Sequence, residues 1–260
     1  MIIPFNKYEG TGNDFIIVRN NPRLLDHNDN NIFKRLCNRR FGIGADGLIL
    51  IEDSPGYDFK MLYYNADGSP GEMCGNGGRC AAHFVMKHLT APRNLSFLAG
   101  DGPHTARSAG DDIIEISVRD VRESKETPDG IMVNTGVPHL VIFTDDTERA
   151  DFVTFARGIR YSSRYAPEGV NVNLVRVTDN GLVIRTYERG VEDETLSCGT
   201  GATASAIAAA LTGKIVTGET RVSVRGGELH IRFVTDGAAA SEVYLTGPAT
   251  FVFSGETEIL

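Results

Sequence analysis

Two stretches that place a cysteine before a glycine-rich turn are the residues best suited to chemistry: MCGNGGRC at 73–80 and SCGTGATA at 197–204. The first turn of a helix presents N–H groups without intrahelical partners and carries a partial positive charge. Glycine lets the backbone close tightly around an anion. Each stretch therefore predicts a seat for a carboxylate or oxyanion. Cys74 or Cys198 would stand at its rim, with a thiol pKa lowered by the same dipole.

Two such thiols suggest acid–base chemistry at a single carbon atom. One sulfur, as a thiolate, could remove the α-proton of an amino acid while the other, as a thiol, returns a proton from the opposite face. Helix N-termini would stabilise the negative charge that develops. A cysteine in a glycine turn can equally be a small apolar filler. We interpret Cys37 and Cys80 in this way, since both fall inside helical patterns.

The elements that would position these cysteines repeat along the chain. Apolar periodicity predicts helices over 77–89 and 200–213, directly after the two turns, and further helices over 26–40 and 147–162. The helix that follows Cys198 is apolar all round and is therefore expected to be buried. At a shift of 124 residues, Cys74 falls on Cys198 and Tyr63 on Tyr187. Since short β-branched strands fill the remainder, we expect a duplicated, strand-rich domain, with the break within 119–130.

Composition narrows the class of partner. The 260 residues carry a net charge of −8 and no Lys/Arg run, so we expect a small-molecule substrate and no nucleic acid. No apolar run is long enough to span a membrane, and the first residues do not read as a signal peptide. The cysteine spacing does not fit a structural zinc site. We therefore expect free thiols, a cytoplasmic location and no membrane association.

Two further glycine motifs are weaker signals. The stretch GIGADG at 42–47 matches a dinucleotide-binding pattern, but it follows a helix and precedes a strand, which is the reverse of the required order. We interpret it as a loop near the site. In GTGNDF at 10–15, Asn13 could bind substrate or merely close a turn.

Ordered blocks along the whole chain resemble the diaminopimelate epimerase family. They include GTGNDF, FGIGADG, YYNADGSPGEMCGNGGRC, NTGVPH, EGVNVNLV, YERGVEDETLSCGTGA and YLTGPATFVFSG. The resemblance implies an α/β (α+β) fold of two pseudo-symmetric domains. Each would be a strand-rich, barrel-like sheet around a central buried helix, with the active site in the interdomain cleft. The implied domains are 1–119 with 250–260, and 120–249.

The resemblance also implies an isomerase and its site residues. The reaction would interconvert LL- and meso-2,6-diaminopimelate, in lysine and peptidoglycan precursor synthesis, without pyridoxal phosphate or a metal. Cys198 would take the proton from the LL isomer and Cys74 would reprotonate the other face, while His139 and Glu188 tune their ionisation. Substrate contacts match Asn13, Asn65, Asn171, Glu188 and Arg189, and the seats of the reacting carboxylate match Gly75, Asn76, Gly199 and Thr200.

Three positions depart from the pattern of some members of the family. Gly47 stands where some have glutamine and Val137 where some have asparagine, which puts contacts with the distal end of the substrate in doubt. Phe253 stands where some have a tyrosine at a dimer contact. A homodimer remains the expectation, because phenylalanine keeps the apolar ring.

Three alternatives stay open on the residues alone. The chain could be a related two-cysteine racemase acting on another amino acid, such as proline, hydroxyproline or histidine. It could be an isomerase of the same fold that uses a carboxylate, or a thiol-based redox or ligand-binding protein. Glu188, Arg189 and Asn171 argue for a substrate with a polar far end.

Overall fold

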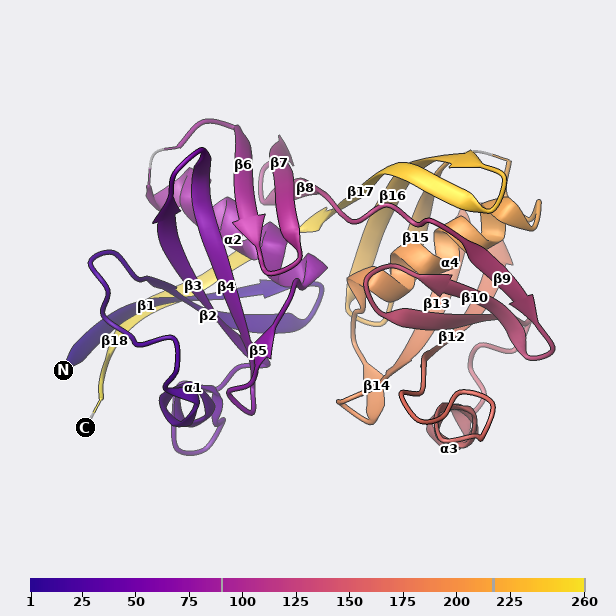
Figure 1. Ribbon diagram of the computed structural model, residues 1–260, viewed down its shortest axis with the longest axis horizontal. Helices are drawn as coiled ribbons and strands as arrows, with labels where there is room; N and C mark the ends of the chain where they lie inside the picture. Colours follow the sequence, from indigo (N-terminus) through magenta and orange to yellow (C-terminus); the bar gives the residue numbers. More distant parts are fainter. Residues whose placement is uncertain (90, 217, 260) are drawn as a thin grey trace. The chain divides into compact units, whose positions relative to one another are not determined.

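The computed structural model of the chain describes residues 1–89, 91–216 and 218–259. The chain divides into two units (Figure 1): unit 1 comprises 1–116 with 247–260, and unit 2 comprises 117–246. The polar stretch 119–130, where the break was expected, lies inside unit 2 and includes a short strand over Ser124–Thr127. Two strands continue across the boundaries between the units.

Unit 1 consists of strands that pair around one long helix, with a second, shorter helix outside. Its elements are β1 (Ile2–Gly10), β2 (Asn13–Arg19), α1 (Asn30–Cys37), β3 (Gly47–Ser54), β4 (Tyr57–Asn65), β5 (Pro70–Gly71), α2 (Gly75–His88), β6 (Asn94–Ala99), β7 (Gly102–Gly110), β8 (Ile113–Ser117) and β18 (Thr250–Glu258).

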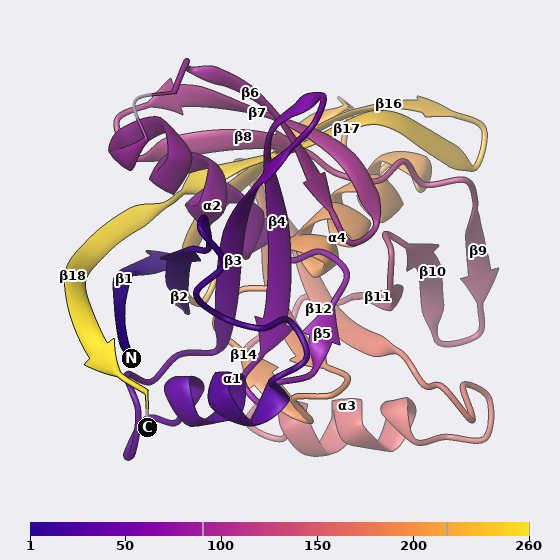
Figure 2. The same ribbon diagram turned by 60° about the vertical axis from the view of Figure 1, so that its left-hand side comes forward.

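The sheet of unit 1 combines antiparallel and parallel pairs. Strand β1 lies between β18 and β2 and is antiparallel to both, and Figure 2 shows β18 running beside it. Strand β2 runs parallel to β3, β3 is antiparallel to β4, and β4 runs parallel to β6. Hairpins then join β6 to β7 and β7 to β8.

Unit 2 has the same composition of elements. They are β9 (Ser124–Thr127), β10 (Gly130–Asn134), β11 (Pro138–Phe143), α3 (Phe152–Arg160), β12 (Asn171–Thr178), β13 (Gly181–Glu188), β14 (Asp193–Thr195), α4 (Gly199–Leu211), β15 (Glu219–Val224), β16 (Gly227–Asp236) and β17 (Ala239–Pro248).

The pairing of unit 2 repeats that of unit 1 strand by strand. Strand β10 lies between β9 and β11, β11 runs parallel to β12, and β13 runs parallel to β15. Strands β3 and β12 begin 124 residues apart, at Gly47 and Asn171, as do the helices that start at Gly75 and Gly199. In unit 1 the C-terminal strand β18 takes the place that β9 takes in unit 2. The expected pseudo-symmetric, strand-rich α/β fold is therefore confirmed for each unit.

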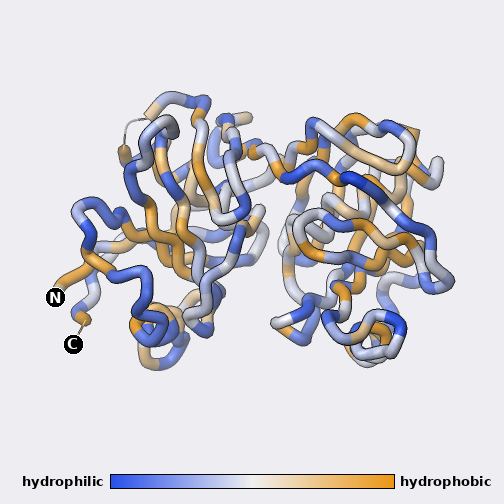
Figure 3. Tube along the Cα trace, viewed as in Figure 1, coloured by the Kyte–Doolittle hydropathy of each residue, from blue (hydrophilic) through white to orange (hydrophobic). Residues whose placement is uncertain are grey.

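Each long helix is enclosed by the strands of its own unit. Helix α2 packs against β1, β2, β3, β4, β7 and β18, and α4 packs against β10, β11, β12, β13, β15 and β16. Residues 201–209 of α4 are all buried, which its unbroken run of small and apolar residues allows. Figure 3 shows hydrophobic residues along the strands and hydrophilic residues on the turns. Among the described helices, none has both the length and the hydropathy that a membrane span requires.

Two helices are shorter than the sequence predicts. Helix α1 begins only after Asp29, whose side chain accepts a hydrogen bond from the Ile32 N–H at 3.1 Å, and it ends at Cys37. Asn38 is its C-cap with an extended backbone, and Arg39 lies beyond it, where its guanidinium pairs with Asp14 and Asp46. Helix α3 covers only Phe152–Arg160 of the expected 147–162.

One side chain was assigned to the wrong environment. The apolar pattern over 77–89 predicts Leu89 on the inward face of the helix that follows Cys74. It is 39% exposed because it stands beyond the last helical residue, at the C-cap of α2.

Candidate functional site

Cys74 is the N-cap of α2. Its backbone is extended (φ −125°, ψ 119°), and its Sγ accepts a hydrogen bond from the Gly77 N–H at 3.4 Å. An N-cap side chain that accepts from the first turn is placed at the positive end of the helix. The half-buried sulfur is therefore where the sequence places it, with Gly75 and Asn76 forming the first turn beside it.

Asn13 and Asn76 meet directly at this sulfur. The Asn13 Oδ1 accepts from Asn76 Nδ2 at 3.2 Å and lies 3.8 Å from the Cys74 Sγ, which donates to it as a thiol. The Asn13 Nδ2 donates to Asp46 Oδ2 at 2.8 Å. Asn13 thus binds the thiol side chain, and the loop that contains Asp46 lies against the site as expected.

A network of ion pairs lies next to Asn13. Asp14 accepts from Lys7 Nζ at 2.5 Å and from both terminal nitrogens of Arg39, which also pairs with Asp46 at 2.7 Å. Burial alone would raise the pKa of Asp14, but the hydrogen bonds from Arg39 and Lys7 hold that pKa well below its usual range. The network holds two cations and two carboxylates, so it fixes the loop without adding net charge.

Asn65 lies at the end of β4, opposite Gly47 in the register, and its amide donates to the Ser69 Oγ at 3.1 Å. A Cβ at Gly47 would stand 2.6 Å from the Tyr63 ring and 2.8 Å from the Tyr64 carbonyl oxygen. The ring of Tyr63 therefore occupies the space that a larger side chain at position 47 would need. Among the described hydrogen bonds, none joins the Asn65 side chain to Cys74.

Cys198 is the N-cap of α4 and repeats the backbone of Cys74 (φ −122°, ψ 106°). It is only 5% exposed. Its Sγ lies 3.4 Å from the Thr200 Oγ1. Gly201, in the first turn, allows the helix to approach β12 and β13, because a Cβ there would stand 2.5 Å from the Asn173 Oδ1.

His139 lies behind Thr200 and is completely buried on β11. Asn173 fixes its tautomer: the Asn173 Nδ2 donates to the Leu140 carbonyl at 3.2 Å and to His139 Nδ1 at 3.1 Å, while its Oδ1 accepts from Thr186 Oγ1 at 2.9 Å. The proton of neutral His139 is therefore on Nε2, which donates to Thr200 Oγ1 at 3.0 Å. While it accepts from His139, the Thr200 hydroxyl keeps its own proton for donation to the Cys198 sulfur, and such a donation favours a thiolate there.

Burial, together with the positive charge of Arg189, lowers the pKa of His139 to about 3. The imidazole is consequently neutral at physiological pH. It is linked to Cys198 through Thr200, whose Oγ1 lies 3.0 Å from the His139 Nε2 and 3.4 Å from the Cys198 Sγ, and it carries no charge of its own.

Asn171, Glu188 and Arg189 lie together at the adjoining strand ends of β12 and β13. The Arg189 N–H donates to the Asn171 Oδ1 at 2.8 Å, and the Arg189 Nη1 donates to the Glu168 carbonyl at 3.3 Å. The Glu188 carboxylate accepts a hydrogen bond from the Thr195 hydroxyl. Asn171 Nδ2 is 3.5 Å from His139 Nε2, so these three residues lie next to the histidine.

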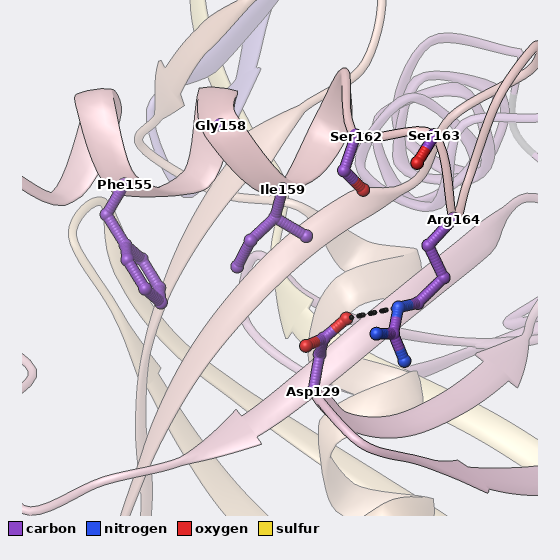
Figure 4. Close-up of a pocket in the computed structure, with 7 residues that line it drawn as sticks. All are labelled: Asp129, Phe155, Gly158, Ile159, Ser162, Ser163 and Arg164. Atoms are coloured by element: carbon purple, nitrogen blue, oxygen red, sulfur yellow. Dashed lines mark ion pairs between the residues drawn. The ribbon is translucent and has the colours of Figure 1, made fainter.

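Figure 4 shows a groove on unit 2. It is lined by Asp129, Phe155, Gly158, Ile159, Ser162, Ser163 and Arg164, and the ion pair of Arg164 Nε with Asp129 Oδ2 at 3.1 Å crosses it. None of the residues predicted for the site lines this groove.

The sequence did not indicate three residues that contact the predicted site residues. Asn173 fixes His139 and Asp46 holds Asn13, and the buried Arg79 donates to Asn76. The period of a strand could have indicated Asn173, which shares the face of Asn171 two residues earlier. Arg79 could have been noticed as a charged residue in an otherwise buried helix.

The remaining cysteines have no such surroundings. Cys37 and Cys80 are buried, and all four cysteines are free thiols. Burial raises the pKa of the Cys37 thiol to about 12 and raises that of Cys80 still further. Both therefore stay protonated and fit the packing role expected of them.

Comparisons with known proteins agree along the whole chain. A sequence model of a protein family described as "Diaminopimelate epimerase" matches residues 5–118 and 131–252. A curated protein named diaminopimelate epimerase from Flavobacterium psychrophilum is 46% identical and covers 95% of this chain and 97% of its own. One of the same name from Chlorobaculum tepidum is 40% identical, with 95% and 98% covered.

A solved structure resembles the fold. The phenazine biosynthesis protein of the PhzF family from Bacillus anthracis covers 100% of both chains with a TM-score of 0.75. Its sequence is only 14% identical, so this similarity concerns the fold alone.

The depressed pKa of His139 predicts a pH-dependent stability. Because the histidine is neutral in the folded chain and protonates in the unfolded chain below its ordinary pKa of about 6.5, its contribution is lost as pH falls from there toward 3. When the pH is lowered from about 7.5 to about 5, the free energy of unfolding of the unmodified protein should fall by ~2 kcal/mol more than that of a His139→Gln variant. Urea unfolding of both proteins at the two pH values measures this. Equal losses would show that His139 is not held neutral.

Proposed function

This chain belongs to the diaminopimelate epimerase family, and from that premise we propose that it interconverts LL- and meso-2,6-diaminopimelate by moving one α-proton between two cysteines. The observation that carries the proposal is the duplicated N-cap. Both units begin a helix enclosed by their strands with a cysteine, and both surround that cysteine with side chains that govern its protonation. The two units are then the two epimerase domains.

The proposed reaction is balanced within the site. The Cys198 thiolate takes the α-hydrogen of the LL isomer as a proton and becomes a thiol, and the electron pair stays on the α-carbon. Cys74, as a thiol, gives its proton to the opposite face and becomes a thiolate. The reverse reaction exchanges the roles, so no cofactor or oxidant is required.

The protonation states that this direction needs agree with the hydrogen bonds around each sulfur. In this proposal Thr200 accepts from His139 and donates its own proton toward the Cys198 sulfur, while the Asn13 oxygen accepts from the thiol of Cys74. A donor favours the thiolate and an acceptor favours the thiol. We propose that His139 tunes the ionisation of Cys198 through Thr200. Glu188 lies beside this group, at the end of β13.

The charge that develops on the substrate needs positive groups that are already in place. We propose that the reacting carboxylate accepts from the first-turn N–H groups at Gly75 and Asn76 and at Gly199 and Thr200, since these are the positive ends of α2 and α4. Such preorganised donors lower the barrier where an anion forms.

The far end of diaminopimelate is a second amino acid. In this proposal the Arg189 guanidinium binds the distal carboxylate and Glu188 the distal ammonium, while Asn13, Asn65 and Asn171 fix the orientation. Proline and other substrates without a polar far end would leave these groups unpaired, which strongly disfavours them.

The activity is tested by incubating the purified protein with LL- and meso-diaminopimelate, lanthionine, proline and histidine, followed by chiral chromatography. We expect conversion of diaminopimelate, and a fall of about 10²-fold or more in kcat for Cys74→Ala and for Cys198→Ala. Cys80→Ala, in the same helix but completely buried, is the matched control and should retain most activity.

Other outcomes would overturn the assignment. Turnover of proline or histidine without diaminopimelate would favour another two-cysteine racemase. Retained turnover in both cysteine variants would favour an isomerase that uses a carboxylate. Full activity after oxidation of the thiols would exclude the thiolate mechanism.

We also propose that the enzyme is a homodimer that works in the cytoplasm, in the synthesis of lysine and peptidoglycan precursors. Val252 and Phe253 on β18 are 51% and 45% exposed, and Ile2 on the paired strand β1 is 62% exposed. We call the positions of Val252 and Phe253 on β18 the strip, because exposed apolar side chains such as these are of the kind that partners cover. Reducing conditions would keep the catalytic thiols available.

The dimer is tested at the strip. Phe253→Glu places a charge on it and should convert the native dimer to a monomer, as measured by size-exclusion chromatography with light scattering. Glu256→Gln, on the same strand, is the control and should stay dimeric. A native protein that is monomeric at micromolar concentration would contradict the proposal.

A further inference from the structure

Arg79 is a large, fully buried side chain with 0% exposure. It lies in the second turn of α2, five residues after Cys74. Moving a guanidinium out of water is costly unless an opposite charge or a full set of hydrogen bonds replaces the water. Its partners therefore show what the charge is for.

Every hydrogen-bond partner of Arg79 is neutral. The Nε donates to the Pro248 carbonyl at 3.2 Å, the Nη1 to the Gly75 carbonyl at 3.3 Å and to the Asn76 Oδ1 at 3.1 Å, and the Nη2 to the Thr11 Oγ1 at 3.4 Å. Among the described residues no carboxylate forms an ion pair with it. The guanidinium is thus solvated by the protein but its charge is not neutralised.

Among the described residues, the other ionisable groups around α2 form no ion pair with Arg79. Cys80 follows Arg79 in the chain, and burial raises its thiol pKa so far that it stays neutral. Glu9 on β1 is half-buried and bonds the Gly12 N–H at 2.9 Å instead. Burial lowers the pKa of Arg79, and negative charge on Cys80, Cys74 or Glu9 would oppose that lowering.

The charged network on the other side of Asn13 is balanced by itself. Lys7 and Arg39 pair with Asp14 and Asp46, so cations and carboxylates are equal in number. Neither of these carboxylates pairs with Arg79. The group in the site that can become an anion during the proposed reaction is the Cys74 thiol.

Arg79 is joined to that thiol through two asparagines. Because a guanidinium only donates, its bond to the Asn76 Oδ1 turns the Asn76 Nδ2 toward Asn13. The Asn13 Oδ1 that accepts this bond is the atom 3.8 Å from the Cys74 Sγ. This chain fixes the guanidinium relative to the sulfur, but the Asn13 oxygen at its end accepts from the sulfur only in its thiol form. Any stabilisation of the thiolate must therefore come from the positive charge of Arg79 itself.

The repeat shows that the charge is not needed to build the helix. At the shift of 124 residues, Arg79 falls on Thr203 of α4. The Thr203 hydroxyl donates to the Gly199 carbonyl at 2.9 Å, which is the counterpart of the Gly75 carbonyl bound by Arg79. A small neutral residue satisfies the same carbonyl in unit 2, where the sulfur has His139 and Thr200 instead.

We propose that Arg79 is a positioning residue whose fixed positive charge stabilises the thiolate of Cys74. This rests on the proposed function, in which Cys74 must become a thiolate after each turnover of the LL isomer and serve as the base in reverse. The two thiols thus reach usable acidity by different means, a buried cation in unit 1 and an oriented neutral hydrogen bond in unit 2.

The test measures the acidity of Cys74 without using activity. In a Cys198→Ser background, the rate of alkylation of Cys74 by iodoacetamide, located by mass spectrometry, is followed against pH. Arg79→Gln should raise the Cys74 pKa by about one unit or more, and Arg79→Lys, which keeps the charge, should leave it nearly unchanged. In a Cys74→Ser background, Arg79→Gln should not move the pKa of Cys198.

An unchanged Cys74 pKa in folded Arg79→Gln would overturn the proposal and leave Arg79 a purely structural role. Should Arg79→Gln fail to fold, Thr11→Asp keeps the guanidinium and gives it a carboxylate, at a residue whose φ of 53° suits aspartate. It should raise the Cys74 pKa, and no change would again contradict the proposal. Absence of epimerisation with these shifts intact would defeat only the proposed function.

Discussion

The N-terminus of an enclosed helix imposes the constraint on which the other features of each site depend. Its first N–H groups have no partners in the helix and must be satisfied by water, a cap or a ligand. In both units the residue at the cap is a cysteine, and the following glycine leaves the backbone open. The helix dipole favours the thiolate form of a sulfur at that position, and the same N–H groups attract a carboxylate. The chemistry that we propose uses both tendencies together.

The surroundings of the two cysteines differ even though the order of their elements is duplicated. Cys74 is half-buried beside an asparagine oxygen, with the uncompensated guanidinium of Arg79 behind it. Cys198 is buried beside a threonine hydroxyl whose direction is set by neutral His139. Such a difference suits a reaction that needs one thiol and one thiolate, because two identical sites would give neither cysteine a preferred protonation state. The pair would titrate as a coupled system, with apparent pKa values that belong to both thiols.

Sequence alone predicted the features whose cause is local. The helices after Cys74 and Cys198 followed from an apolar pattern and a glycine turn, and the repeat followed from a few identities at a fixed shift. The sequence does not indicate strands β7 and β9, because GPHTARSAG and SKET are polar and form strands only through their neighbours. Arg79 and Asn173 were missed for a related reason. Each acts through a partner that folding supplies, Asn76 for one and His139 for the other.

The fate of the α-hydrogen tests the central claim most directly. LL-diaminopimelate is incubated with the enzyme in D₂O, and the reaction is stopped at low conversion. The isomers are then separated, and the deuterium content of each is measured by mass spectrometry. Two cysteines acting from opposite faces predict deuterium at the inverted carbon of the meso product and almost none in the recovered LL substrate. Deuterium appearing equally fast in the recovered substrate would mean that one base serves both faces, which contradicts the account.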